Sequence, residues 1–488
     1  MVKLPKGFFE IGEKKLRNYQ RNTVAFGINK GSCGILLDMG LGKTLCAVNI
    51  ARYHIQFDKI KKVLVVCPAS LPLKWQESIE ESSEHKAVIL PSNREKRVQT
   101  ALTNKEKFHI INYQSLWPLI RDVGDKADKA DKKLKYDMII FDESGKYLKH
   151  PTSRISEYAM YLSDYAKYKL ILTGTLIGNH PLNLWVQFYC LNGGRSFGSS
   201  FNWFENRFFY KSSRNNITRS YLKQQYIEKF REVIQKNCIR YERKEVLPEL
   251  PEIIEDRIEI EFNLTLTNSY NSLKKGIISD IEAEEKTKKL TVMNIFEKLI
   301  RLQQFTSGFI SKGKGTEQKL KETPKLNTLV EEVETIIENE ESVVIWCRFS
   351  YTIDMIAERL KKHNVLILDG RVTNKKKKYS IWREFQKSKD KNILIAQSES
   401  GGFGIELFKE NPNEKAKYEH SIIYENTWSP DTREQLKARI LRSGLKSVCR
   451  VVDITVKDTI DETILNVLRR KKEIADIVEK VGIKQFLG

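Results

Sequence analysis

Short apolar runs alternate with amphipathic segments along the chain, and the whole pattern occurs twice. In the first half, runs typical of buried strands occur at 34–37, 63–67, 108–111, 137–141 and 170–172. Segments with apolar residues at helical spacing separate most of these runs, which is typical of a parallel sheet covered by helices on both faces. In the second half the pattern returns at 343–347, 365–368, 393–396, 422–424 and 448–452. The pattern therefore predicts an α/β protein with two lobes, each built on a parallel sheet.

The residues between the two repeats have a different character. Six aromatic residues crowd 201–210, and long charged segments with helical patterns follow them. Pro248 and Pro251 indicate a turn or linker. We therefore expect residues 1–250 to form an N-terminal lobe with a helical insertion at about 186–245, residues 251–325 a linker with a second helical insertion, and residues 326–488 a C-terminal lobe.

Composition places the chain among globular proteins. Of its 488 residues, 40% are hydrophobic and 10% aromatic, which argues against disorder. No stretch approaches the roughly 18 consecutive apolar residues of a membrane span, and residues 1–7 lack the apolar core of a secretion signal. The seven cysteines are scattered without C-x-x-C pairs, so they indicate no disulfide framework. We expect a reduced, cytoplasmic protein.

The charge balance is strongly basic. Lysine and arginine number 84 against 63 acidic residues, which gives a formal net charge of +21. Such an excess suits a polyanionic partner, because phosphates that bind basic side chains release counterions into the solvent. Solvated surface lysines without a binding role would produce the same composition. The charge therefore supports a polyanionic partner only if sequence motifs indicate the same partner.

The run 38–44, Asp-Met-Gly-Leu-Gly-Lys-Thr, lies between a predicted strand and a predicted helix. A strand, a turn that contains glycine and a helix together form a phosphate cradle, because amide groups at the helix start point at the anion. Lys43 would then reach the outer phosphates and the Thr44 hydroxyl would hold Mg²⁺. Leu37 stands at the first glycine of the pattern G-x-x-x-x-G-K-[ST]. An ordinary glycine turn that caps a helix is the alternative.

An apolar run about a hundred residues later ends in two adjacent carboxylates, Asp142 and Glu143. The carboxyl ends of buried parallel strands lie at the ligand crevice. There Asp142 can bind Mg²⁺, and Glu143 can orient and deprotonate the attacking water. The alternative is an acidic strand exit without a function. Either the loop at 38–44 or the paired carboxylates could lack a function if it occurred by itself. Both features in this order favour nucleotide hydrolysis.

The ordered motifs resemble helicase superfamily two, and most closely its Swi/Snf-type branch of double-stranded-DNA translocases. The segments that carry the resemblance are 16–20, 38–44, 68–75, 142–143, 172–179, 240–248, 368–370 with 401–407, and 435–444. The resemblance implies two RecA-like lobes with helical insertions between them, ATP and Mg²⁺ as cofactors, and DNA as the partner. The sequence shows little beyond these motor motifs and two insertions, which suggests a bacterial or phage-infected cell as the setting, in which protein partners supply targeting.

The resemblance assigns roles to individual residues of the nucleotide site. The glutamine of the first motif, Gln20, would read adenine, and Thr44 and Asp142 would hold the metal ion. The residues implied in nucleotide binding are Gln20, Met39, Gly40, Leu41, Gly42, Lys43, Thr44, Asp142, Gly404 and Gln435. The implied catalytic residues are Lys43, Glu143, Arg439 and Arg442.

Arg439 and Arg442 lie three positions apart, so they share one face of a helix. Guanidinium groups that come from the opposite lobe would stabilise charge on the transferring phosphoryl group. Hydrolysis would then depend on closure of the lobes. A basic surface helix is the alternative interpretation.

Contacts to the nucleic acid are expected on both lobes, mainly to phosphates and largely independent of sequence. Trp428, at a strand exit, is a candidate for facing the cleft. The remaining candidates are Ser70, Lys74 and Thr175 on the first lobe, and Arg348 and Ser400 on the second. Each could equally be a capping or surface residue.

Some positions depart from the family pattern. Ser144 and Gly145 follow the paired carboxylates where the family usually has Ala-His, and that histidine links the hydrolytic site to the motif at 172–179. The leading hypothesis is a DNA-dependent ATPase that translocates on mainly duplex DNA. A strand-separating DNA or RNA helicase and an ATP-regulated nucleic-acid-binding scaffold with weak hydrolysis remain open.

Overall fold

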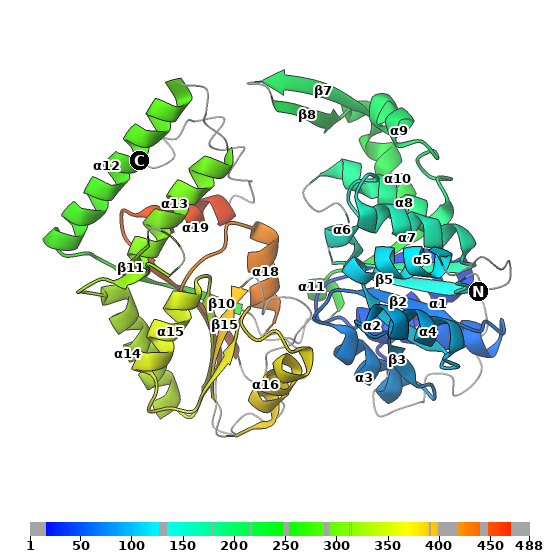
Figure 1. Ribbon diagram of the computed structural model, residues 1–488, viewed down its shortest axis with the longest axis horizontal. Helices are drawn as coiled ribbons and strands as arrows, with labels where there is room; N and C mark the ends of the chain where they lie inside the picture. Colours follow the sequence, from blue (N-terminus) through cyan, green and yellow to red (C-terminus); the bar gives the residue numbers. More distant parts are fainter. Residues whose placement is uncertain are drawn as a thin grey trace. The chain divides into compact units, whose positions relative to one another are not determined.

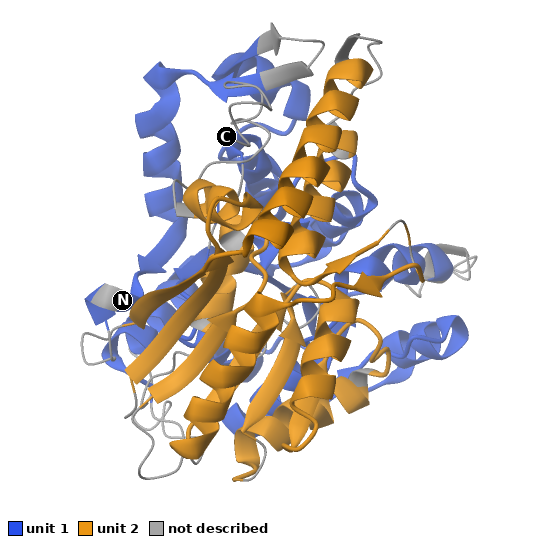
Figure 2. Cartoon of the chain, turned by 90° about the vertical axis from the view of Figure 1, so that its left-hand side faces the viewer, with its two compact units in different colours: residues 1–248 blue, residues 249–488 orange. Residues whose placement is uncertain are grey.

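The computed structural model describes residues 16–125, 134–174, 176, 180–214, 217–246, 253–286, 292–311, 313, 315–389, 392–398, 418–439 and 448–469. The chain divides into two compact units, Met1–Pro248 and Glu249–Gly488 (Figure 2). Residues 251–325, which the sequence assigns to a separate part, belong to the second unit. The two units are described one at a time.

Unit 1 is built on a parallel sheet in which seven described strands follow the order β3-β4-β2-β5-β6-β1-β9 (Figure 1). The strands are β1 (Ser32–Leu37), β2 (Val63–Cys67), β3 (Ala87–Ile89), β4 (Phe108–Asn112), β5 (Met138–Asp142), β6 (Tyr168–Leu172) and β9 (Cys238–Tyr241). The strand runs predicted in the first half of the chain are confirmed. The short β3 and β9 were not predicted.

Helices cover both faces of this sheet. They are α1 (Asn18–Lys30), α2 (Lys43–Gln56), α3 (Pro72–Ser82), α4 (Arg94–Thr103), α5 (Leu116–Asp125), α6 (Ser144–Tyr147), α7 (Arg154–Tyr165) and α8 (Leu184–Asn192), with 3₁₀ turns at Tyr113–Ser115 and Pro181–Asn183. Alternate strand residues such as Leu64, Val66, Ile139 and Phe141 join one core cluster with α4, α5, α7 and α8. The neighbouring residues Val63, Val65 and Ile140 are equally buried. Burial on both faces explains why these strands read as continuous apolar runs.

The insertion expected at 186–245 contains more than helices. After α9 (Phe201–Phe208), the antiparallel strands β7 (Phe209–Arg214) and β8 (Ile217–Leu222) form a hairpin. A 3₁₀ turn (Gln224–Tyr226) and α10 (Ile227–Asn237) return the chain to the main sheet as edge strand β9, which α11 (Arg243–Val246) follows.

Unit 2 repeats the architecture with a parallel sheet of six described strands in the order β10-β17-β16-β13-β15-β14. The strands are β10 (Ile253–Ile260), β13 (Ser342–Cys347), β14 (Val365–Leu368), β15 (Ile393–Gln397), β16 (Tyr418–Ile423) and β17 (Val448–Val456). The strand runs predicted in the second half are present, and the edge strand β10 joins them. Together the two sheets confirm the predicted α/β fold class.

The helices of unit 2 form two groups. The helices α14 (Pro324–Glu338), α15 (Ser350–Arg359), α16 (Lys375–Lys387) and α18 (Pro430–Ala438) flank the sheet, and β11 (Phe309–Ile310) pairs with β12 (Gln318–Lys319). The long α12 (Leu264–Lys286) and α13 (Val292–Thr306) share a separate apolar cluster with α19 (Ile460–Arg469). Among the residues that the structure describes, no helix combines the length and apolar character needed to cross a membrane.

His109 on β4 gives unit 1 a specific sensitivity to acid. The ring is fully buried, and its Nδ1 lies 2.9 Å from the Tyr136 hydroxyl. Burial, assisted by the charge of Lys62, lowers the pKa of His109 to about 4. Since an unfolded histidine titrates near pH 6.5, the unfolded chain takes up the proton first. The stability that His109 contributes is therefore present above about pH 6.5 and falls as the pH drops toward 4.

We predict that His109→Gln makes unfolding less dependent on pH. Between pH 7 and 4.5 the variant should lose about 2–3 kcal/mol less stability than the parent chain. Urea unfolding of the full chain at the two pH values measures this difference. His150→Gln, which replaces an exposed histidine, is the matched control and should leave the pH dependence unchanged. If the free energy of unfolding changed equally with pH in the parent chain and in His109→Gln, His109 would not be the source of the acid sensitivity.

Candidate nucleotide-binding site

The loop between β1 and α2 has the geometry of a phosphate cradle. Gly40 and Gly42 have φ values of +79° and +81°, which glycine adopts without strain. A Cβ added at Gly42 would lie 2.5 Å from Gln20 Nε2, so a side chain there would displace the Gln20 amide, and the left-handed backbone would strain it as well. The loop ends at Lys43, the first residue of the 14-residue helix α2. Its first amide groups and the helix dipole favour an anion at this position.

Lys43 lies at the junction between this loop and α2. Its ammonium donates to the carbonyl oxygen of Leu37 at 2.8 Å, at the carboxyl end of β1. A Cβ added at Gly174 would lie 3.9 Å from Lys43 Nζ, so the segment after β6 adjoins the lysine. The structure therefore brings the motif at 38–44 and the beginning of the motif at 172–179 to the same edge of the sheet.

Segments that are distant in sequence hold the phosphate loop in place. Gln20 Nε2 and the Tyr19 hydroxyl both donate to the Leu41 carbonyl, at 3.1 and 3.2 Å. On the other side, the backbone amide of Arg243 donates to Asp38 Oδ2 at 2.8 Å, and its guanidinium donates to the Met39 carbonyl. Gln20 is thus buried beside the loop. The bracing role of Arg243 does not follow from the motif pattern.

Asp142 is buried at the carboxyl end of β5, with 5% of its surface exposed. Its carboxylate accepts hydrogen bonds from Trp75 Nε1 at 2.9 Å and from the Glu143 amide at 3.0 Å. Burial, and then the adjacent charge of Glu143, raise the pKa of Asp142 to about 6. A buried carboxylate of this kind favours a positively charged ligand. Trp75 positions that carboxylate from α3, a role that its place beside Lys74 in the sequence does not reveal.

Glu143 has a strained backbone. Its φ of +51° and ψ of +41° lie in the left-handed region, which is uncommon for residues other than glycine. Strain of this kind is typical of functional sites, where the surrounding structure holds the residue in place. Glu143 stands at the start of α6 and is half-buried, beside the buried Asp142.

The two residues after the carboxylates make a buried connection. Ser144 is fully buried, and its hydroxyl donates to Gln187 Oε1 at 2.9 Å. Gln187, on α8, donates through Nε2 to the carbonyl oxygen of Leu176 at 2.8 Å. Hydrogen bonds therefore connect the end of β5 to the segment after β6, where the motif resemblance led us to expect a histidine and the chain has Ser144 and Gly145. Gln187 lies outside every motif, so sequence analysis could not identify it.

The described nucleotide-site candidates of unit 2 lie on α18 and at its end. Gln435 is half-buried on this helix, and Arg439 is buried at its end, where its amide donates to the Leu436 carbonyl. Arg433 anchors the helix to β17 through a buried ion pair with Asp453 at 2.5 Å. Arg442 and Gly404, and the nucleic-acid candidates Thr175 and Ser400, lie outside the described residues.

The described nucleic-acid candidates differ in exposure. Ser70 is exposed after β2, and Lys74 is half-buried in the first turn of α3. Trp428 is half-buried, with its ring edge-on to Phe296 at 6.0 Å in the helical cluster of unit 2. Arg348 is half-buried directly after β13.

A buried polar network fixes the backbone around Arg348. The carboxylate of Glu425 accepts hydrogen bonds from the amides of Arg348 and Phe349 at 2.6 and 2.9 Å. Gln303 on α13 accepts from the Arg348 guanidinium at 3.2 Å and donates to the Asn426 carbonyl at 2.8 Å. The helices outside the sheet are thus hydrogen-bonded to the ends of β13 and β16.

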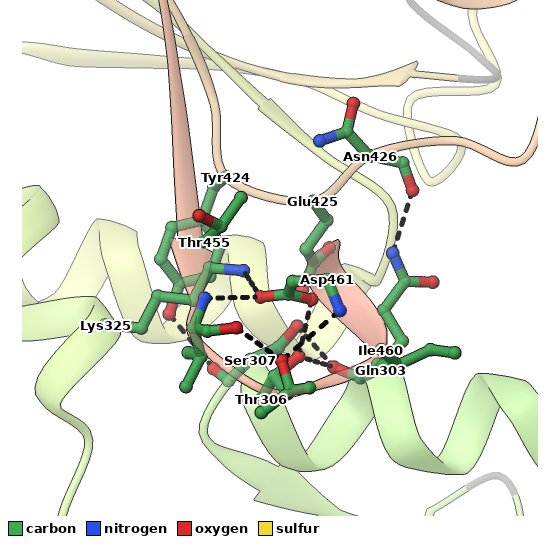
Figure 3. Close-up of polar contacts among 12 residues, drawn as sticks. Gln303, Thr306, Ser307, Lys325, Tyr424, Glu425, Asn426, Thr455, Ile460 and Asp461 are labelled. Atoms are coloured by element: carbon green, nitrogen blue, oxygen red, sulfur yellow. Dashed lines mark hydrogen bonds and ion pairs between the residues drawn. The ribbon is translucent and has the colours of Figure 1, made fainter. Parts of the chain in front are cut away.

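A buried ion pair lies in the same region of unit 2. Lys325 and Asp461 are 2.6 Å apart, and Thr306 donates to the second carboxylate oxygen of Asp461 at 2.9 Å. Figure 3 shows these side chains pointing toward one another from α14, α19 and α13.

Comparisons with known proteins agree with this geometry. The family model described as SNF2-related domain matches residues 19–308. The chain is 25% identical over 492 residues to a Mycoplasma pneumoniae protein named "Uncharacterized ATP-dependent helicase", covering 97% of this chain and 43% of that protein. It is 25% identical over 475 residues to the Drosophila melanogaster "SWI/SNF-related matrix-associated actin-dependent regulator of chromatin subfamily A-like protein 1", covering 96% and 56%. The chain spans about half the length of these curated relatives.

The fold is similar to that of the Hef helicase domain of Pyrococcus furiosus, with a TM-score of 0.51, 16% identity and coverage of 93% of this chain and 98% of that one. The likeness identifies the two sheets as RecA-like lobes. Because the family model matches more than half of the residues, the chain belongs to the SNF2-related family, and the resemblance that its motifs indicate is confirmed.

Proposed function

We propose that the chain is a DNA-dependent ATPase that couples hydrolysis to translocation on mainly duplex DNA and so remodels DNA or protein–DNA complexes. The observation that carries the proposal is the phosphate cradle before α2 with the buried Asp142 and the strained Glu143 at the end of β5. Membership of the SNF2-related family supports the same chemistry.

ATP fits the residues around the phosphate loop. The triphosphate would lie over Gly40–Thr44, with Lys43 at the outer phosphates and Gln20 at the adenine. Thr44 and Asp142 would hold Mg²⁺, since a hydroxyl and a carboxylate are the hard oxygen ligands that this ion prefers. When bound, the ion supplies charge neutralisation at the phosphates.

Glu143 is the proposed general base. Its half-buried side chain, beside the buried Asp142, would orient the attacking water and accept its proton. Arg439 and Arg442, from the second unit, are the proposed groups that stabilise charge on the transferring phosphoryl group.

The proposed DNA contacts are largely independent of base sequence. The candidate residues are Ser70, Lys74, Thr175, Arg348, Ser400 and Trp428, and a net charge of +21 favours a polyanion in general. A strand-separating helicase and a scaffold that hydrolyses ATP weakly are the competing functions. Stimulation by duplex DNA rather than by single strands or RNA supports translocation. Binding without stimulation by any nucleic acid supports the scaffold.

We predict that Lys43→Ala and Glu143→Gln each reduce DNA-stimulated ATP hydrolysis by at least about 10²-fold, since each removes a group that acts on the reacting phosphate or water. Steady-state hydrolysis with duplex DNA, single-stranded DNA, RNA and no nucleic acid measures the effect. Glu80→Gln, an exposed glutamate on α3, is the control and should hydrolyse ATP at the parent rate. An unchanged rate in either site variant would refute the site.

We also predict that Ser144→Ala and Gln187→Leu uncouple hydrolysis from DNA. Each variant breaks the buried connection from β5 to Leu176, so the hydrolysis rate without DNA should persist while the stimulation by duplex DNA falls. The ATP hydrolysis rates with and without duplex DNA, together with thermal unfolding, separate a role in coupling from a structural role. Ser163→Ala is the matched control, because Ser163 is a buried serine that hydrogen-bonds within its own helix. A parallel loss of both rates and of stability would indicate a purely structural connection.

A further inference from the structure

The aromatic residues at 201–210 divide into two groups in the structure. Phe204, Phe208 and Phe209 are buried in the core of unit 1. Trp203 and Tyr210, in contrast, are 52% and 54% exposed. Of the ten large hydrophobic side chains that are exposed among the described residues, four lie between 203 and 227. Exposed aromatic rings that adjoin one another are more informative than exposed side chains scattered singly.

The β7–β8 hairpin explains how the exposed rings meet. Its antiparallel register pairs Phe209 with Leu222 and Tyr210 with Tyr221. Because successive residues of a strand face opposite sides, Phe209 and Leu222 pack on the core while the two tyrosines face outward. Their rings are stacked, with centroids 5.5 Å apart and planes 24° apart, and Tyr221 is 44% exposed. We call Tyr210 and Tyr221 the tyrosine platform.

The opposite face of the hairpin is anchored firmly. The Glu205 carboxylate, on α9, pairs with Lys211 at 2.9 Å and accepts from the Ser220 hydroxyl at 2.8 Å. Lys223 donates to the carbonyl oxygens of Asn206 and Arg207 at the end of α9, both at 3.0 Å. These contacts fix the base of the hairpin on α9, and Figure 1 shows β7 and β8 next to that helix.

The surrounding sequence is basic. Residues 201–237 contain eight lysines and arginines against three glutamates, a net charge of +5. A second exposed tyrosine pair, Tyr161 and Tyr165, lies on α7 with ring centroids 5.2 Å apart, but that helix carries one arginine against one glutamate and one aspartate. The hairpin itself, residues 209–222, carries Lys211, Arg214 and Arg219 and no acidic residue, so excess positive charge accompanies the stacked rings at the hairpin and not on α7.

Stacked aromatic rings within a basic segment are suited to unpaired nucleotides. Each base has a flat face that stacks on an aromatic ring, while the phosphates are attracted to the positive charge. Inside a duplex, both faces of a base are already covered by its neighbours. Tyrosine and arginine are also common in protein interfaces, but the net charge of +5 favours a polyanion over an average protein surface.

We propose that the tyrosine platform binds single-stranded DNA by stacking unpaired bases, so that the protein engages duplex DNA that adjoins an unpaired strand. The proposal takes DNA as the partner from the proposed function but does not depend on ATP hydrolysis. It adds a contact for unpaired bases to the backbone contacts proposed for the duplex.

The test is fluorescence anisotropy of the full chain with a labelled single strand and with a duplex of the same sequence. Tyr210→Ala/Tyr221→Ala should weaken binding of the single strand by about 5- to 100-fold, as expected for the loss of one stacked base, and leave duplex binding nearly unchanged. Tyr210→Phe/Tyr221→Phe keeps the rings and should bind the single strand like the parent chain. Tyr161→Ala/Tyr165→Ala is the matched control and should also bind normally.

Two outcomes would overturn the proposal. An equal loss for single strand and duplex would mean that the platform contacts the backbone rather than bases. Parent-like binding of both by the double alanine variant would mean that the platform contacts neither form of DNA. The duplex-stimulated ATPase rate of the same variants separates the two hypotheses. If the parent chain lacks that rate, the proposed function fails, whereas the anisotropy comparison still decides the role of the platform.

Discussion

The burial of Asp142 is the constraint on which the site depends. A carboxylate with 5% of its surface exposed loses most of its hydration, and only the Trp75 indole and the Glu143 amide donate to it among the described contacts. Its raised pKa reflects that cost. The ammonium of Lys43 opposes the shift from across the phosphate loop. A bound cation would oppose the shift much more strongly.

The phosphate loop is suited to an anion, whereas the buried Asp142 is suited to a cation. Its glycines remove side chains where an anion would approach, and their left-handed backbone would cost other residues free energy. Glycines also make the loop more flexible, and contacts from residues near both ends of unit 1 restrict that flexibility. Gln20 and Tyr19 hold the Leu41 carbonyl, and Arg243 holds Asp38 and Met39. A preorganised loop loses little conformational entropy when it binds phosphate.

Sequence predicted the fold class and the central strands because strands buried on both faces, such as β5, are continuous apolar runs. It missed β10, whose Glu255 and Arg257 interrupt the apolar pattern at the edge of its sheet. Lys43, Asp142 and Glu143 could be identified because their motifs are contiguous. Trp75, Gln187 and Arg243 could not be assigned their roles, since the residues they contact lie 67, 43 and 205 positions away in the chain. Such contacts arise only from the topology of the parallel sheet.

The β7–β8 hairpin depends on contacts along one of its faces for its stability. An isolated pair of strands is marginally stable in water, so it persists only if one face is anchored. In β7 and β8, Phe209 and Leu222 provide apolar anchoring, and Glu205 and Lys223 supply polar contacts to α9. None of these contacts involves the rings of Tyr210 and Tyr221. Removing the two rings should therefore alter the surface of the hairpin without unfolding it. The stacked rings add a cross-strand contact of roughly 0.2–1 kcal/mol to the hairpin, and a binding role gives a physical reason for keeping that contact exposed.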